Sequence, residues 1–369
     1  MFMQIRRLKK IRSKALRLCY NGRMVKKINR RQFLTRSASA LAGLAIIPFN
    51  LDGLLSEDSL DLGRICIDSI SIYSQPSDKS KILYQRYRDE IIHLYDEVIS
   101  DDGPDYNPLW YRVWGGYVHS ARIQRVFFRT NPIEYDIPES GYLAEVTVPA
   151  TQTMRYTTVY GWQPIYRLYY ESTHWVIGIE KGPDGKPWYK IMDELLDIPY
   201  LVEAEHLRLI SPEEYAPIAT DVPFGKKRVE VKLATQMLTA YENDQIVLQT
   251  KIASGIPHLE SENNSIPTNT PTGTFNVYSK MPSKHMGDGN ITDDITAYEL
   301  PGVPWTSFFA PHGVAFHGTY WHNNFGITMS HGCVNMRTDE AKWLFRWLDF
   351  AAQENKIETT GYGSQVIVS

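Results

Sequence analysis

The sequence has 369 residues, of which 43% are hydrophobic and 22% are charged. This length allows two or three domains, and the composition excludes a chain that is disordered throughout. No apolar run reaches the roughly 18 residues of a membrane-spanning helix. Aromatic residues reach 12%, and there are 24 Gly and 21 Pro residues. These features favour short strands and tight turns over a helical bundle.

The charges are unevenly distributed along the chain. Residues 1–36 hold 13 of the 39 Lys and Arg residues and no acidic residue. A basic tail outside the folded part disfavours nucleic-acid binding, so we expect no nucleic-acid partner. Residues 30–34, Arg-Arg-Gln-Phe-Leu, resemble a twin-arginine (Tat) export signal, and the apolar stretch 38–49 fits its hydrophobic region. We therefore expect residues 1–50 to direct export across the cytoplasmic membrane, as a cleaved signal or a retained anchor. The alternative is a basic cytosolic tail followed by a buried helix.

Short alternating segments between residues 61 and 211 predict strands at the spacing of small barrels. The segment 103–113 is repeated at 182–191, because each has a Gly-Pro-Asp turn followed by a Trp-Tyr strand. The repeat predicts two β-barrels in tandem, at 61–130 and 142–211. Both resemble bacterial SH3-type modules, and the second copy is the more divergent.

The aromatic pairs of the repeat have two interpretations. The resemblance to SH3-type modules implies contact with wall glycan or peptide, whereas aromatic side chains of small barrels also fill the barrel core. The residues concerned are Trp110, Tyr111, Trp188 and Tyr189.

A further β pattern begins near residue 227 and predicts a separate domain over 227–369. Residues 228–248 indicate a hairpin, whereas residues 279–304 form a long irregular stretch of the kind that often serves as a lid. Apolar residues at helical spacing predict one helix over 338–353, with Thr338 as its N-cap.

The chemistry of the chain is concentrated in residues 314–337. A strand predicted over 314–319 contains His317, and Cys333 follows Gly332 just before the predicted helix. A thiolate is the nucleophile of cysteine enzymes, and a nearby imidazole can generate it. The backbone N–H groups at Gly332 and Cys333 could face a developing oxyanion. The helix that starts near Thr338 is expected to lower the pKa of the thiol.

These residues have two other interpretations. A zinc site needs three or four converging ligands, but two of the five candidates lie in irregular loops, so we expect no metal. A buried core thiol fits poorly with Ser, His and Gly neighbours. The candidate ligands were His312, His317, His322, His331 and Cys333.

The same segment closely resembles the catalytic domain of L,D-transpeptidases (YkuD type). Its signature is a strand ending in His-Gly, followed by Ser/Thr-His-Gly-Cys-x-Asn or -Arg, and here these are residues 317–318 and 330–335. The resemblance covers 227–369 and includes Gln236 and the Gly-bearing segments 254–255 and 270–275. It implies a β-sandwich with one helix on its C-terminal side, so the whole chain is expected to be mainly β.

The resemblance also implies the roles of the site residues. Cys333 would be the nucleophile and His317 the general base, with the backbone carbonyl of Gly318 orienting His317. His331 and Gly332 would form the oxyanion wall. The residues expected to shape the pocket are Ser330, Asn335 and Arg337. Arg337 could bind a substrate carboxylate, although an ion pair at the helix end is an equal alternative.

The reaction implied is a cross-linking of peptidoglycan stem peptides that needs no cofactor. Cys333 would attack the third residue of a tetrapeptide, release D-Ala and pass the acyl group to an amine, forming a 3→3 cross-link. An L,D-carboxypeptidase or another cysteine-dependent wall peptidase is the second interpretation. An inactive wall-binding protein is the third, but both Cys333 and His317 are present.

Overall fold

The computed structural model describes residues 61–257, 268–349 and 358–369. All of these belong to one compact unit of the chain. The export signal expected at 1–50 lies outside the described residues, so export stays a prediction. Within the described ranges, no helix is both long and apolar enough to cross a membrane.

The expected mainly β fold is confirmed, because the described residues form five sheets and only two α-helices. In the described part of the chain the strands form open sheets with no closed barrel, so the two small barrels expected at 61–130 and 142–211 are not confirmed. Each sheet draws its strands from one of three stretches of sequence, 62–126, 142–209 and 227–368.

Residues 62–126 form two antiparallel sheets around a small apolar cluster. The strands are β1 (Leu62–Ile65), β2 (Ser69–Tyr73), β3 (Ile82–Tyr87), β4 (Ile91–His93), β5 (Asp96–Ile99), β6 (Leu109–Val113), β7 (Gly116–His119) and β8 (Ile123–Val126). Their orders are β4-β1-β8 and β3-β2-β7-β6-β5. The alternating side chains of these strands place Ile65, Ile72, Tyr111, Val118 and Ile123 in one core cluster.

Residues 142–209 form a single seven-stranded sheet. The strands are β9 (Tyr142–Val146), β10 (Ala150–Thr157), β11 (Gly161–Tyr169), β12 (Thr173–Lys181), β13 (Pro187–Asp193), β14 (Ile198–Glu203) and β15 (Leu207–Leu209). Their order is β11-β10-β14-β13-β12-β9-β15.

The repeat seen in the sequence lies on β6 and β13, each of which begins after a turn. Its four aromatic residues are at most 5% exposed, and Tyr111 and Tyr189 belong to the two core clusters. The aromatic pairs therefore pack inside, as the second interpretation of the repeat had it. The SH3-type identity of both stretches and their contact with the wall stay predictions.

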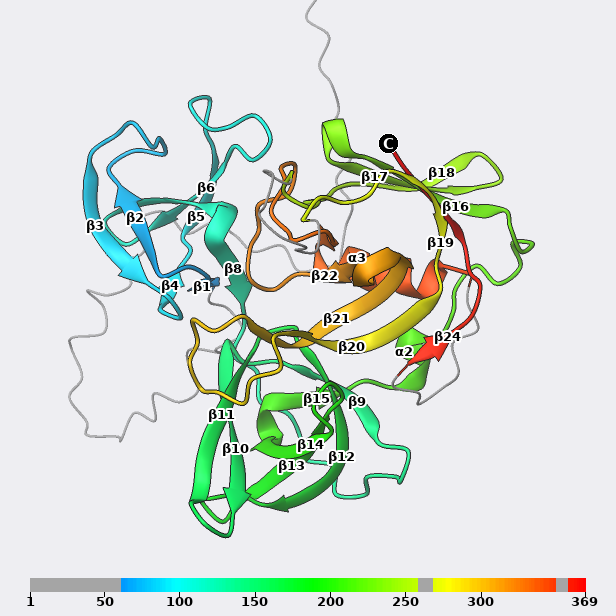
Figure 1. The fold of residues 1–369 in the computed structure, drawn as a ribbon. Helices are drawn as coiled ribbons and strands as arrows, with labels where there is room; N and C mark the ends of the chain where they lie inside the picture. The colour runs from blue at the N-terminus through cyan, green and yellow to red at the C-terminus, as the bar shows by residue number, and fades with distance from the viewer. Residues whose placement is uncertain (1–60, 258–267, 350–357) are drawn as a thin grey trace, which may run out of the picture. The chain divides into compact units, whose positions relative to one another are not determined.

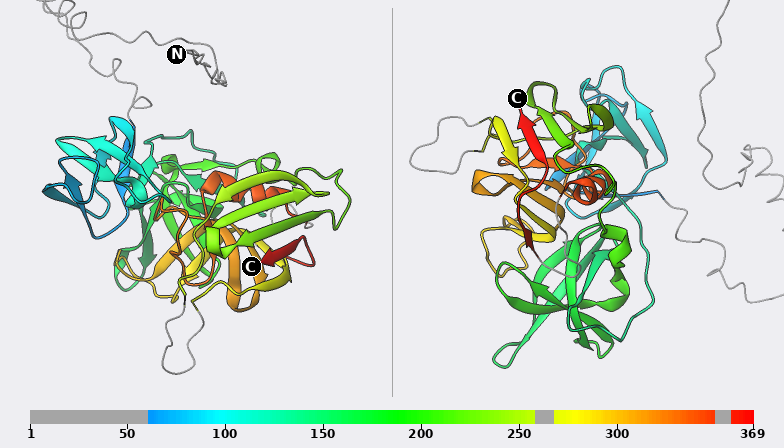
Figure 2. Two further views of the ribbon diagram at one scale, coloured as in Figure 1. Left: turned by 90° about the horizontal axis from the view of Figure 1, so that it is seen from above. Right: turned by 90° about the vertical axis from the view of Figure 1, so that its right-hand side faces the viewer.

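The part of the chain that begins at residue 212 contains two five-stranded sheets and both helices. The elements are α2 (Pro212–Tyr215), β16 (Lys227–Lys232), β17 (Met237–Glu242), β18 (Gln245–Lys251), β19 (Gly273–Asn276), β20 (Ser279–Gly287), β21 (Glu299–Ala310), β22 (Val314–Gly318), β23 (Val334–Met336), α3 (Thr338–Trp347), β24 (Thr359–Thr360) and β25 (Gln365–Val368). The sheet orders are β18-β17-β16-β25-β19 and β23-β22-β21-β20-β24. The right-hand view of Figure 2 shows β25 in red between β19 in yellow and β16 in green.

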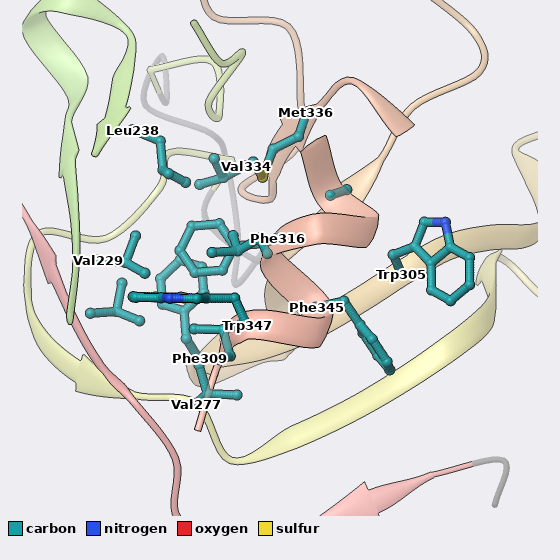
Figure 3. Packing of buried hydrophobic residues seen from close by; sticks show 14 of the residues in the cluster. Val229, Leu238, Val277, Trp305, Phe309, Phe316, Val334, Met336, Phe345 and Trp347 are labelled. Atoms are coloured by element: carbon teal, nitrogen blue, oxygen red, sulfur yellow. The ribbon is translucent and has the colours of Figure 1, made fainter. Parts of the chain in front are cut away.

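The core of this stretch lies between the two sheets and α3. Figure 3 shows Phe309, Phe316 and Trp347 on the side of Val229, while Phe345 faces Trp305. These side chains belong to one cluster, and the rings of Trp305 and Phe345 are 5.6 Å apart. Burial of an aromatic side chain contributes about 1.5–3 kcal/mol or more. This core fixes β22, β23 and α3 against one another.

Two predicted elements differ from the structure. The helix ends at Trp347 rather than at residue 353, and its N-cap is Arg337 rather than Thr338. The stretch 279–304, expected to be irregular, is mostly the long hairpin of β20 and β21, which Figure 1 shows beneath α3. Pairing along nearly the whole hairpin, from Ser279 and Phe308 to Gly287 and Glu299, overrides the low strand preference of its Gly and Pro residues.

Candidate active site

Strands β22 and β23 place the candidate nucleophile and base on one face of a sheet. The two strands pair in parallel, with Phe316 opposite Val334 and His317 opposite Asn335. Cys333 directly precedes Val334, so it lies one step along the ladder from that pair. Because side chains alternate between faces, Cys333, Asn335 and His317 point to the same side.

His317 is held as a neutral base by its backbone neighbour. Its ring is 2% exposed, and Nδ1 lies 2.9 Å from the carbonyl oxygen of Gly318. A carbonyl only accepts, so Nδ1 carries the proton and Nε2 is the basic nitrogen. Burial lowers the pKa of His317 to about 4, although the bond to Gly318 opposes this shift. The imidazole is therefore uncharged at neutral pH.

Cys333 is a protonated thiol rather than a thiolate. Its Sγ lies 3.7 Å from the carbonyl oxygen of Gly313, and it borders the pocket, where it is partly exposed. Desolvation by the surrounding protein raises its pKa to about 11. The expectation of a lowered pKa is wrong, because strand β23 separates Cys333 from the start of α3 and the effect of the helix fades within a turn.

The backbone around Cys333 is fixed by its own motif. Ser330 Oγ accepts a hydrogen bond from Gly332 N–H at 3.2 Å and donates one to the carbonyl of Cys333. Gly332 has a φ of 118°, which favours glycine. Because the Gly332 N–H already donates its hydrogen bond to Ser330 Oγ, the N–H groups of His331 and Cys333 are the candidates for binding an oxyanion.

The segments upstream of the motif hold it in place. Gln236 bonds Ser254 twice, through its Oε1 to the backbone N–H and through its Nε2 to Oγ, both at 2.8 Å. The carbonyl of Ser254 in turn accepts the backbone N–H of Ser330 at 3.1 Å. Thr270 Oγ1 accepts a hydrogen bond from the Gly255 N–H at 2.9 Å and donates one to the carbonyl of Gly332 at 2.7 Å. Residues that the sequence placed near the motif therefore act as its scaffold.

A pocket of about 350 Å³ opens at these side chains. His317 and Cys333 line it, and residues 295–300, at the tip of the β20–β21 hairpin and the start of β21, border it from another side. Tyr298 of this hairpin lies 5.8 Å from the ring of His331, centroid to centroid, in an edge-to-face contact. The motif residues that also line the pocket are Ser330, His331 and Asn335.

Arg337 does not line this pocket. Its guanidinium pairs with Glu340 at 3.6 Å and lies 4.9 Å from the ring centroid of Phe325. The structure thus places Arg337 in the ion pair at the helix end that was the alternative to a role in the pocket.

Other pocket residues were missed by the sequence analysis. Trp321 lies 5.6 Å from the ring of His317, and Tyr320 packs edge-on against Trp321 at 4.9 Å. Both follow directly after the predicted His-Gly strand, and this proximity was the available signal. Tyr298 and the residues of 62–126 at the pocket come from distant parts of the chain, where no local pattern marks them.

The histidines considered as metal ligands are not gathered around one point. Within the described ranges no group of three or more His, Cys, Asp or Glu side chains could hold a metal ion. His312 is exposed with a φ of 61°. His322 is buried, and its Nε2 lies 2.9 Å from the side-chain amide of Asn335.

Comparison with known proteins identifies the domain. Residues 226–368 match the YkuD family model, described as the L,D-transpeptidase catalytic domain, so this part of the chain is a domain of that enzyme family. No curated protein matches the chain.

Several solved structures are also similar to the chain. An L,D-transpeptidase from Xylanimonas cellulosilytica is 23% identical, over 40% of this chain and 62% of that one, with a TM-score of 0.28. An L,D-transpeptidase from Mycobacterium smegmatis is 17% identical, over 47% of this chain and 73% of that one, with a TM-score of 0.30. The catalytic domain of the E. faecium L,D-transpeptidase is 28% identical, over 40% of this chain and 98% of that one, with a TM-score of 0.29. The chain therefore spans less than two thirds of the first of these proteins.

Proposed function

We propose that this protein is a peptidoglycan L,D-transpeptidase that forms 3→3 cross-links through a thioester on Cys333. The observation that carries the proposal is the shared sheet face of Cys333 and a neutral, oriented His317 at the mouth of a pocket, within a YkuD domain. A protonated thiol beside an unprotonated imidazole nitrogen is the starting state that nucleophilic acyl transfer needs.

The first half of the reaction makes the acyl-enzyme. His317 Nε2 takes the thiol proton as Sγ attacks the carbonyl carbon of the third residue of a tetrapeptide. The N–H groups of His331 and Cys333 stabilise the negative charge on the carbonyl oxygen. The tetrahedral intermediate collapses, the C–N bond breaks, and the nitrogen of D-Ala leaves with the proton from His317. The product is a thioester and free D-Ala.

The second half transfers the acyl group to an amine. The amine of a neighbouring stem attacks the thioester carbonyl while His317 Nε2 accepts its proton. The C–S bond then breaks and the sulfur recovers the proton, which regenerates the thiol. Water in place of the amine would give a tripeptide, the product of an L,D-carboxypeptidase. The hairpin tip that borders the pocket at residues 295–300 favours transfer by limiting access of water.

Incubation with purified disaccharide-tetrapeptide, followed by mass spectrometry of the products, tests this function. We expect a cross-linked dimer that lacks one D-Ala. A tripeptide as the main product would instead establish a carboxypeptidase. The absence of both products from folded protein would overturn the proposal.

This function also requires that the enzyme reach the wall, and residues 30–34 support export by the twin-arginine route. Replacing Arg30 and Arg31 by Lys should retain the protein in the cytoplasm, as cell fractionation would measure. Unchanged export of that variant would contradict the route.

A further inference from the structure

The N-terminal stretch 62–126 contributes residues to the catalytic pocket. Arg64, Cys66, Arg88 and Arg122 line the same pocket as Cys333. Three of these four residues carry a guanidinium group, and they lie more than 200 positions from Cys333 in the sequence. The pocket is therefore built from distant parts of the chain, and Tyr169 of β11 also lines it.

Hydrogen bonds fix Arg122 beside the catalytic segment. Arg122 ends the short 3-10 turn Ser120–Arg122, and the neighbouring carbonyl of Ala121 accepts the N–H of Asn323 at 2.8 Å. Asn107 Nδ2 donates to the carbonyl of Asn323 at 3.2 Å. The carbonyl of Arg122 itself accepts Cys66 N–H at 2.9 Å. Because Asn323 follows soon after His317, this turn is held against the loop that leaves the active site.

Two of the three arginines already have carboxylate partners. Arg64 is buried, and its Nη1 lies 3.0 Å from Asp89 Oδ1. Its Nη2 donates to the carbonyl of Tyr320 at 2.8 Å. Arg88 lies 2.6 Å from Asp68 Oδ1, measured from Nη2. Their charges are therefore compensated within the protein.

Arg122 differs from both, because its guanidinium has no hydrogen bond or ion pair with any described residue. Partial burial lowers its pKa, and only the weaker influences of Cys66 and Tyr106 oppose this shift. The described lining of the pocket includes one carboxylate, that of Glu299. Its Oε2 already pairs with His285 Nε2 at 2.9 Å. The pocket that Cys333 lines thus also holds a partly desolvated cation with no counter-charge among its described lining residues.

We infer that Arg122 binds a carboxylate of the stem peptide, so that the N-terminal stretch completes the substrate site of the catalytic domain. This inference rests on the proposed function. A guanidinium binds a carboxylate through paired N–H groups, and desolvation strengthens such a contact. A tetrapeptide with a diamino dicarboxylic third residue offers two carboxylates near the scissile bond, one on that residue and one on the terminal D-Ala.

Peptide binding to Cys333→Ala protein, measured by isothermal titration calorimetry, tests the inference without turnover. Adding Arg122→Gln should raise the Kd of the tetrapeptide about 10- to 100-fold, the range expected for a lost charge-assisted contact. Adding Arg122→Lys should recover part of the affinity. Arg112→Gln, on β6 and outside the pocket lining, is the matched control, with a change below about threefold, because Asp96 already pairs with Arg112.

Two carboxamide peptides identify which carboxylate is bound. Amidation of the recognised carboxylate should raise the Kd for the protein that retains Arg122 about as much as Arg122→Gln does. The amidated peptide should then bind the Arg122→Gln protein no more weakly than the free peptide does. Amidation of the other carboxylate should leave the difference in Kd between the two proteins unchanged. Two results would overturn the inference. The first is equal affinity of the proteins with and without Arg122→Gln when both melt at the same temperature, and the second is no binding of any peptide. Turnover by the unmodified enzyme tests the proposed function separately.

Discussion

At the scale of single residues, the proposed nucleophile Cys333 and the proposed base His317 are both uncharged before substrate arrives. Burial raises the pKa of Cys333 to about 11 and lowers that of His317 to about 4. The proton transfer must therefore accompany attack on the substrate rather than precede it. The sequence showed the thiol, the imidazole and the start of the helix. It could not show the desolvation, which decides whether the pKa of Cys333 rises or falls.

The pH dependence of alkylation follows from these pKa values. Only the thiolate reacts with iodoacetamide, so labelling of Cys333 should rise about tenfold per pH unit from pH 7 until the pH nears 11. Peptide mapping by mass spectrometry gives the rate at each cysteine. A rate that is already at its plateau near pH 7 would indicate a thiolate–imidazolium pair and would refute this description.

Cys66 provides an internal comparison for that experiment. Burial also raises its pKa, and it is 6% exposed, so it should be labelled more slowly than the partly exposed Cys333. Cys66 lies in the stretch 61–130, which the sequence predicted as a module separate from 227–369, and the structure places both cysteines at one pocket. The local sequence around Cys66 contained no sign of this neighbour.

The scaffold of the motif depends on Gln236. Gln236→Ala removes both bonds to Ser254 and leaves a buried backbone N–H without its acceptor. The free energy of unfolding should fall by about 1–3 kcal/mol, and the cross-linking rate should fall with it. Urea unfolding and the product assay measure the two effects. Gln249→Ala, on an exposed position of β18, is the control, and equal effects of both variants would contradict the role of Gln236.

At the scale of elements, a buried ionic contact ties the β20–β21 hairpin to strand β13. His285 on β20 lies 2.8 Å from Asp193 through Nδ1 and 2.9 Å from Glu299 through Nε2. An ionised carboxylate can only accept hydrogen bonds. Both ring nitrogens of His285 must therefore donate one, so the imidazole is protonated. The contact raises the pKa of His285 and lowers that of Asp193, against the opposing effect of burial on each group. It positions the hairpin that borders the pocket.

The stability of the protein should therefore depend on pH through this contact. The His285 contribution is complete below its ordinary pKa of about 6.5 and is lost as the pH rises through the raised folded value. The Asp193 contribution is present above about pH 3.9 and is lost as the pH falls through the lowered folded value. Melting temperatures should be highest between these limits.

The variant His285→Gln isolates this effect. Its melting temperature should fall most between about pH 4 and 6.5, where the native contact is charged, because two buried carboxylates then lose their cation. His93→Gln, on an exposed position of β4, is the control. A pH profile of His285→Gln that runs parallel to that of the unmodified protein would rule out the contact as the source of the dependence.

At the scale of the whole described unit, the stretch 142–210 supplies part of the catalytic core. Leu143, Trp175 and Ile210 belong to the same cluster as Phe309 and Trp347. The sequence predicted a separate domain over 227–369, preceded by two modules at 61–130 and 142–211. Because of the shared core cluster, removal of residues 61–211 would expose apolar side chains of the catalytic domain.

A single substitution tests this shared core. Leu143 is 1% exposed, so Leu143→Ala should lower the free energy of unfolding by about 2–5 kcal/mol. Leu195 is 42% exposed, so Leu195→Ala should change the free energy of unfolding by less than about 0.5 kcal/mol. Urea unfolding followed at the tryptophans measures both. A small effect of Leu143→Ala would mean that the catalytic core does not depend on β9.

The sequence predicted the features that depend on neighbours along the chain. Cys333, His317 and Gly318 belong to two short motifs, and their geometry follows from the pairing of β22 with β23. It could not predict Arg122 or Tyr298 at the pocket, because their places depend on how distant stretches pack. Helix α3 was predicted with the correct buried face, but its end was missed by several residues, since helical spacing alone does not mark where a helix stops.

Mass spectrometry of the protein during turnover would detect the acyl group that we propose Cys333 carries. Rapid acid quenching followed by peptide mapping should locate an adduct on Cys333 whose mass is that of the tetrapeptide acyl group without D-Ala. The adduct and the release of D-Ala should both be absent from Cys333→Ala. An adduct on another residue, or D-Ala release that survives Cys333→Ala, would contradict the account.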